Sequence, residues 1–101
     1  MRNSLFSIEM TEEAEKNLSA LRNDHSKTPV FKAVSKSLRL LSSNPRHPSL
    51  NTHKYYSLSG PLGEDIFEAY AQNRTPGAFR IFWYYGPSKK VTTVIAITPH
   101  P

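Results

Sequence analysis

The spacing of apolar residues divides the first part of the chain into a strand and a helix. Residues 4–10 alternate between apolar and polar side chains, which predicts a strand. Thr11 then stands where a helix cap is expected, and acidic residues follow it in the first turn, where the helix dipole favours them. Three apolar residues recur at helical spacing, namely Ala14, Leu18 and Leu21. They predict a helix with one apolar side that ends at residues 23–26.

A second helix is predicted to start at Thr28, with Thr28 as its cap and Pro29 at its first helical position. The apolar residues that keep helical spacing here are Phe31, Val34, Leu38 and Leu41. The helix ends before Pro45, because proline disfavours the helical conformation of the residue that precedes it. A short turn joins the two helices, and their apolar sides can together cover one face of a sheet.

Three further strands are predicted in the C-terminal half. Residues 77–85 and 91–97 are rich in β-branched and aromatic side chains, and the break at residues 86–89 has the composition of a hairpin turn. Residues 64–72 form another alternating run, followed by turn residues at 73–77. These three strands are expected to form an antiparallel meander.

The predicted order β-α-α-β-β-β indicates an α+β fold, and 101 residues can bury a single core, so we expect one domain over residues 1–101. The first strand must join an edge of the meander or enter it beside a nonadjacent strand. Both helices are expected on one face of the sheet. If the alternation holds, the open face carries Glu68, Tyr70, Arg80, Phe82 and Tyr84.

Residues 45–63 form the least regular stretch, and we interpret them as a long loop. A loop of this length is usually functional or disordered, and its leucines and tyrosines argue against disorder. Leu50 and Leu58 are expected to anchor it to the core. The loop also carries basic side chains, among them Arg46, His53 and Lys54.

Composition favours a nucleic acid or an acidic protein as the partner. Thirteen Lys and Arg against eight Asp and Glu give a net charge of +5 and a pI near 9.7. Ordinary solubility charge is the alternative explanation. The chain has no cysteine, which excludes disulfides and thiolate metal sites and favours a cytosolic location. No apolar run approaches the ~20 residues of a membrane span, and we expect no signal peptide and no membrane partner.

The candidate chemistry is that of RNA cleavage without a cofactor. The four histidines lack metal-ligand spacing, and neither a phosphate-binding glycine loop nor a nucleophile elbow is present. Cations and aromatic side chains around a sheet face suit RNA. A ribose 2′-hydroxyl can attack the adjacent phosphorus while Arg80 stabilises the phosphorane charge and His100 transfers a proton. Glu68, or a histidine of the 46–54 stretch, would complete the acid–base pair.

Each of these residues also has a purely structural interpretation. Arg80 could form an ion pair with Glu68 across neighbouring strands. His100 could belong to a frayed chain end. The remaining candidates for substrate binding are Arg46, His53, Lys54, Tyr70, Arg74, Phe82 and Tyr84, and for the loop cations among them solubility is the alternative.

Four segments resemble the RelE/ParE superfamily of type II toxins: residues 41–50, 53–54, 78–83 and 95–100. The resemblance covers nearly the whole chain and carries the element order with it. It implies a small twisted antiparallel sheet with two N-terminal helices. For function it implies ribosome-dependent mRNA cleavage in RelE-like members, gyrase poisoning in ParE-like members, and neutralisation by a cognate antitoxin.

By this resemblance, Arg80 matches the arginine that contacts the scissile phosphate, and His100 falls where members keep a C-terminal acid–base residue. Lys54 matches a basic residue before the second strand of the family. The lysines of RelE on that strand are missing here, so a carboxylate–histidine arrangement as in YoeB-like members fits better, with Glu68 or Glu64 as the base. Our hypothesis is an mRNA-cleaving toxin acting in the ribosomal A site. The alternatives are a gyrase-binding toxin and an inactive member that binds only antitoxin or nucleic acid.

Overall fold

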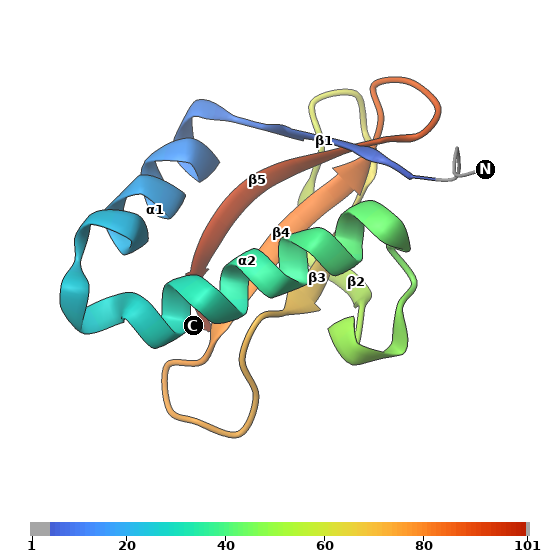
Figure 1. The fold of residues 1–101 in the computed structure, drawn as a ribbon. Helices are drawn as coiled ribbons and strands as arrows, with labels where there is room; N and C mark the ends of the chain where they lie inside the picture. The colour runs from blue at the N-terminus through green and yellow to red at the C-terminus, as the bar shows by residue number, and fades with distance from the viewer. Residues whose placement is uncertain (1–4, 101) are drawn as a thin grey trace.

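One mixed sheet of five strands in the order β1-β5-β4-β3-β2 forms the centre of the molecule, and two helices pack against it (Figure 1). The computed structural model describes residues 5–100, so Ser4, the first residue of the predicted N-terminal strand, lies outside the described residues. The strands are β1 (Ser7–Met10), β2 (His53–Ser59), β3 (Asp65–Tyr70), β4 (Phe79–Tyr85) and β5 (Val91–Pro99). The helices are α1 (Glu12–Asn23) and α2 (Thr28–Ser43), with short 3-10 turns η1 (His25–Lys27) and η2 (Pro48–Leu50).

The α+β class and the antiparallel β3-β4-β5 meander are confirmed. Of the two placements open to the first strand, the structure has β1 at the sheet edge, where it pairs with β5 in parallel. This one parallel pair makes the sheet mixed, whereas the resemblance implied an antiparallel sheet. The connection through α1, α2 and three further strands returns the chain to β1, so the first and last strands lie side by side (Figure 1).

The interpretation of residues 45–63 as a loop is wrong for β2, which pairs with β3 at the other edge. Most side chains of β2 are exposed, and its pairing shifts between Tyr55 and Ser59. An exposed, bulged edge strand leaves no clean apolar alternation in the sequence. Leu50 is buried as expected, but Leu58 is 49% exposed and does not anchor the segment to the core.

The helix starts follow the sequence with one difference. The Thr11 hydroxyl accepts a hydrogen bond from the backbone N–H of Ala14 at 3.1 Å, which confirms the predicted cap of α1. In α2, Thr28 is already helical and Lys27 holds the cap position. Hydrogen bonds from the Ser26 hydroxyl and backbone N–H hold the pKa of Asp24 below its usual value. The connection between the two helices is therefore the 3-10 turn η1, and α2 begins at Thr28, one residue earlier than predicted.

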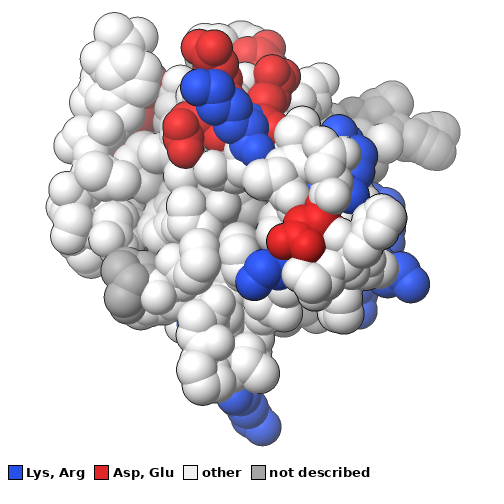
Figure 2. Space-filling view, turned by 90° about the vertical axis from the view of Figure 1, so that its left-hand side faces the viewer, with Lys and Arg blue, Asp and Glu red and all other residues white. Residues whose placement is uncertain are grey.

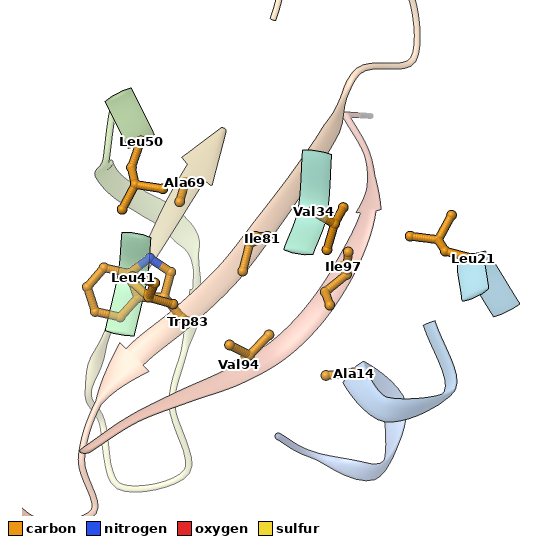
Figure 3. Packing of buried hydrophobic residues seen from close by; sticks show 10 residues of the cluster. All are labelled: Ala14, Leu21, Val34, Leu41, Leu50, Ala69, Ile81, Trp83, Val94 and Ile97. Atoms are coloured by element: carbon orange, nitrogen blue, oxygen red, sulfur yellow. The ribbon is translucent and has the colours of Figure 1, made fainter. Parts of the chain in front are cut away.

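The main core lies between the helices and the sheet (Figure 3). Its buried members are Ala14, Leu21, Val34, Leu41, Leu50, Ala69, Ile81, Trp83, Val94 and Ile97. These include four of the helix residues that the apolar spacing predicted, and the other three, Leu18, Phe31 and Leu38, are partly buried and pack against the core. On β3 and β4 the buried members are every second residue, so the other residues of these strands face the opposite side of the sheet.

Within residues 5–100 no helix covers the opposite face, which carries a smaller apolar cluster. Ile66, Phe82 and Tyr84 form its buried centre, with Tyr55, Ile95 and Ala96 packed around them. The predicted alternation of β3 and β4 is thereby confirmed. We call this side of the sheet the open face.

Candidate active site

A buried carboxylate stands at the centre of the charged part of the open face. Glu68 lies in the middle of β3, and its side chain is only 4% exposed. Its Oε1 is 2.9 Å from Nε2 of His53, and its Oε2 is 3.5 Å from Nε of Arg80 and 3.9 Å from Nε2 of His100. One carboxylate therefore contacts one guanidinium and two imidazoles from three other strands or strand ends. We call Glu68, His53, Arg80 and His100 the charged cluster.

Arg80 is held from several sides. Its Nη1 donates hydrogen bonds to the carbonyl oxygens of Gln72 at 2.8 Å and Phe79 at 3.3 Å. The ring of Tyr70, its cross-strand partner, lies 3.7 Å from Cζ, in the position of a cation–π contact. Its side chain is 8% exposed. The guanidinium thus has a fixed position beneath the surface of the open face.

His53 is oriented by two oxygens. It is the direct cross-strand partner of Glu68, and its Nδ1 lies 3.0 Å from the carbonyl oxygen of Asn51. Asn51 has a left-handed backbone with φ of 47°, which brings this carbonyl back toward the ring. The edge of the ring also contacts Tyr70, with ring centres 5.6 Å apart. These contacts fix the ring while half of the side chain remains exposed.

His100 follows the last residue of β5. Its backbone N–H donates a hydrogen bond to the carbonyl oxygen of Ala78 at 2.7 Å, so the chain is tied to the start of β4 at this point. The interpretation of His100 as a frayed end is therefore wrong. Its imidazole is half-exposed beside Glu68, and it reaches the same carboxylate as His53 from the other side of the cluster.

The ion pair in the cluster is close but incompletely hydrogen-bonded. Oε2 of Glu68 and Nε of Arg80 are both buried and have no hydrogen-bond partner within residues 5–100, although their charges compensate each other. A buried polar atom left without a hydrogen bond costs about 1–3 kcal/mol. Folded proteins keep few such atoms, and an unsatisfied charged cluster is typical of a functional site.

Several predicted site residues lie away from the cluster. Lys54 pairs with Phe67 on the helix-covered side of the sheet, and its Nζ is 3.2 Å from Oδ1 of Asp65. Arg46 and Arg74 are exposed in separate loops. The alternative base, Glu64, accepts a hydrogen bond from the backbone N–H of Leu62 in the β2–β3 turn. Phe82 and Tyr84 are on the open face but are buried in its apolar cluster.

Two groups that position the charged cluster could not be predicted from the sequence. The carbonyl oxygens of Gln72 and Asn51 hold Arg80 and His53, respectively. Backbone carbonyls are present at every residue, so no residue type indicates such a role. Within the part of the chain that the structure describes, no group of three or more metal-ligating side chains is placed to hold an ion.

A hollow of about 220 Å³ lies on the open face beside the charged cluster. It is lined by Tyr55, Leu58, Phe82, Ala96, Thr98 and Pro99. Five of these six side chains are apolar or aromatic. The cross-strand pairing puts Phe82 opposite Glu68 and Thr98 opposite Arg80, so the hollow and the cluster share one surface.

Negative charge is concentrated at the start of α1, away from the charged cluster. The first turn of α1 carries Glu12, Glu13 and Glu15. Figure 2 looks onto the side where α1 lies and shows several acidic side chains close together there. Because the whole chain has a net charge of +5, the remaining surface is correspondingly basic. Among residues 5–100 there is no helix of the length and apolarity needed to cross a membrane.

The comparison with known proteins gives matches among solved structures alone: no protein-family model and no curated protein matches the chain. The YoeB/ParE toxin from Agrobacterium tumefaciens superposes with a TM-score of 0.68 at 10% identity, over 94% of this chain and 99% of that chain. A chain of the archaeal RelE–RelB complex from Pyrococcus horikoshii gives 0.64 at 14% identity, over 94% of both chains.

A chain of the intact RelBE toxin–antitoxin complex of E. coli gives a TM-score of 0.61 at 17% identity, over 95% of this chain and 98% of that chain. These identities are too low to carry residue roles from one protein to another. The coverage is nearly complete in both directions, so the likeness concerns the whole fold. The chain therefore shares the fold of these YoeB/ParE and RelE structures, which is the fold that the resemblance of its sequence motifs implied.

Proposed function

We propose that this protein is the toxin of a type II toxin–antitoxin module and that it cleaves mRNA in the ribosomal A site without a metal ion. One observation carries the proposal: a buried carboxylate holds one arginine and two half-exposed histidines together on the open face. Such a group contains what RNA cleavage through the ribose 2′-hydroxyl requires, namely a base, an acid and a cation.

The exposure of the side chains suggests how the roles are divided. A group that exchanges protons with RNA must reach it, and the two histidines are about half-exposed while Glu68 is 4% exposed. We therefore assign proton transfer to His53 and His100, and we assign to Glu68 the positioning of both rings.

In the reaction, one imidazole removes the proton of the 2′-hydroxyl as its oxygen bonds to phosphorus. The other imidazole protonates the 5′-oxygen as its bond to phosphorus breaks. The products are a 2′,3′-cyclic phosphate and a free 5′-hydroxyl. Arg80 supplies a permanent positive charge for the phosphorane, and its guanidinium is held in place by the hydrogen bonds of Nη1 and by the ring of Tyr70.

The proposed partners follow from fold and charge. Two of the similar structures are toxin–antitoxin complexes, RelE–RelB and RelBE. A net charge of +5 suits both an acidic antitoxin and the ribosome with its message. We propose a cognate antitoxin as the protein partner and the cytoplasm as the place of action.

The proposal is tested by mapping mRNA 3′ ends in a translating extract. The wild-type protein should cut within translated codons, and the cuts should disappear without ribosomes. His100→Ala should abolish them, whereas His25→Ala, which removes an exposed histidine of η1, should cut like the wild type. Intact message with folded wild-type protein would refute the proposed activity.

The burial of Arg80 favours a second candidate. Its guanidinium is enclosed by Tyr70, Glu68 and two carbonyl oxygens, as a structural cation would be. A protein with such a structural pair could bind gyrase without cutting RNA, or bind only an antitoxin or nucleic acid. Inhibited DNA supercoiling with intact message would support the gyrase-binding reading, and expression without growth arrest would support the inactive one.

A further inference from the structure

The hollow on the open face is contiguous with the charged cluster. Tyr55 lies two residues after His53 on β2, so its side chain points to the same side about 7 Å further along the strand. Phe82 and Thr98 are the cross-strand partners of Glu68 and Arg80. A ligand whose anionic group contacts the cluster would therefore extend directly into the hollow.

The lining suits a flat apolar group. Tyr55 and Phe82 contact edge to face with ring centres 5.0 Å apart, and Leu58, Ala96 and Pro99 add aliphatic surface. Pockets for drug-sized ligands usually have about 300–1,000 Å³. The hollow has about 220 Å³, which suits a single planar ring system.

We propose that this hollow binds the nucleobase next to the phosphate held by the charged cluster, an inference that rests on the proposed function. A nucleotide joins an anionic phosphate to a flat ring, so its phosphate can contact the cluster while its base enters the adjoining hollow. The cluster sets one guanidinium and two imidazoles, which are hydrogen-bonding partners of a phosphate, beside one carboxylate. Aromatic and aliphatic surfaces are what unstacked bases contact in single-stranded RNA.

The lining also sets the expected selectivity. Two side chains that line the hollow carry a hydroxyl group, Thr98 on β5 and Tyr55 on β2. A hydroxyl can donate or accept a hydrogen bond, so it discriminates weakly between bases. The contact area between the base and the hollow then determines the affinity, so the hollow should bind purines more tightly than pyrimidines.

The probes for this site are AMP and ribose 5-phosphate, which differ by the base alone. Titrations followed by NMR should show AMP binding the wild type about 5- to 150-fold more tightly, the range expected of one stacked base. Ala96→Leu fills the hollow and should reduce AMP binding to the level of ribose 5-phosphate. The control Ala20→Leu, on the exposed side of α1, should leave the difference unchanged.

Equal binding of the two probes to the wild type, or an AMP advantage that survives in folded Ala96→Leu, would overturn the proposal. If Ala96→Leu fails to fold, Leu58→Ala at the half-exposed rim replaces it and should weaken AMP at least threefold while sparing ribose 5-phosphate. A dimer that forms through the hollow and is lost in Ala96→Leu would also overturn it. The mRNA mapping is independent of both probes, so failure of the base site and failure of the proposed cleavage are distinguishable.

Discussion

The two faces of the same pair of strands reach similar burial by different means. On the covered face, Ala69, Ile81 and Trp83 are fully buried beneath two helices. On the open face, Glu68 and Arg80 are 3% and 7% exposed when the whole residue is counted, and no helix of residues 5–100 lies above them. Apolar packing excludes water from the first face, whereas ion pairs and side chains of the neighbouring strands cover the second. The first face should therefore respond to loss of volume and the second to loss of charge balance.

The largest effect is expected on the covered face, from Trp83→Ala. Trp83 is fully buried and stacks on Phe67 with ring centres 5.1 Å apart. Replacing a buried tryptophan by alanine leaves a cavity and should lower the free energy of unfolding by about 3–5 kcal/mol. Urea unfolding followed by circular dichroism measures it. Tyr56→Ala, at a side chain 82% exposed, should change stability by less than about 0.5 kcal/mol. A loss below about 1 kcal/mol for Trp83→Ala would contradict the assigned core.

On the open face, Arg80→Met should cost nearly as much, because it leaves the Glu68 carboxylate buried without its guanidinium. Removing one partner of a buried pair costs about 3–5 kcal/mol. Exposed histidines beside Glu68 can compensate in part, so we expect about 3 kcal/mol.

The double variant Glu68→Leu with Arg80→Met sharpens this result, because it removes both charges. It should regain most of the lost stability in the same urea experiment, while RNA cleavage stays absent. Additive losses from the two single variants would show that packing, and not charge balance, maintains the open face.

The sequence predicts the faces because successive side chains of a regular strand, such as β3 or β4, point to opposite sides of the sheet. Glu68 is two residues from Ile66 and Tyr70, and Arg80 is two residues from Phe82, so all of them share the open face. The contact between Glu68 and Arg80 then follows from the pairing of β3 with β4. The edge strand β2 was missed because an exposed strand needs no apolar alternation. Without β2 and its register, the sequence could not show that His53 joins Glu68 or that Lys54 points to the other face.

The rest of the site depends on backbone geometry that side-chain patterns do not record. His100 is held in place by a hydrogen bond from its own backbone to Ala78. Arg80 and His53 are fixed by carbonyl oxygens of turn residues. These contacts form only once the turns have their final conformation. The left-handed backbone of Asn51 is such a conformation, and composition alone does not specify it.

A smaller effect is expected from Ser37→Ala, which tests a contact between the helix layer and the cluster. The buried Ser37 of α2 donates a hydrogen bond from Oγ to the carbonyl oxygen of Tyr70 at 3.2 Å. Its loss should cost about 1 kcal/mol in urea unfolding. Ser43→Ala, which removes an exposed hydrogen bond within α2, should cost less. Equal losses would mean that the contact to Tyr70 adds nothing to the joining of the two layers.

The smallest effect on stability and a large effect on function are expected from His53→Ala. The imidazole contacts Glu68 at 2.9 Å, but it is half-exposed, and ion pairs open to water contribute about 0–1 kcal/mol. The free energy of unfolding should therefore change by about 0.5 kcal/mol or less, because Arg80 still balances the buried carboxylate. Loss of a general acid or base lowers the rate about 10²- to 10⁴-fold, and codon-resolved cleavage rates should fall by that amount. A variant that loses more than about 2 kcal/mol of stability, or that cleaves RNA at the wild-type rate, would show that His53 maintains the structure of the open face and does not transfer a proton.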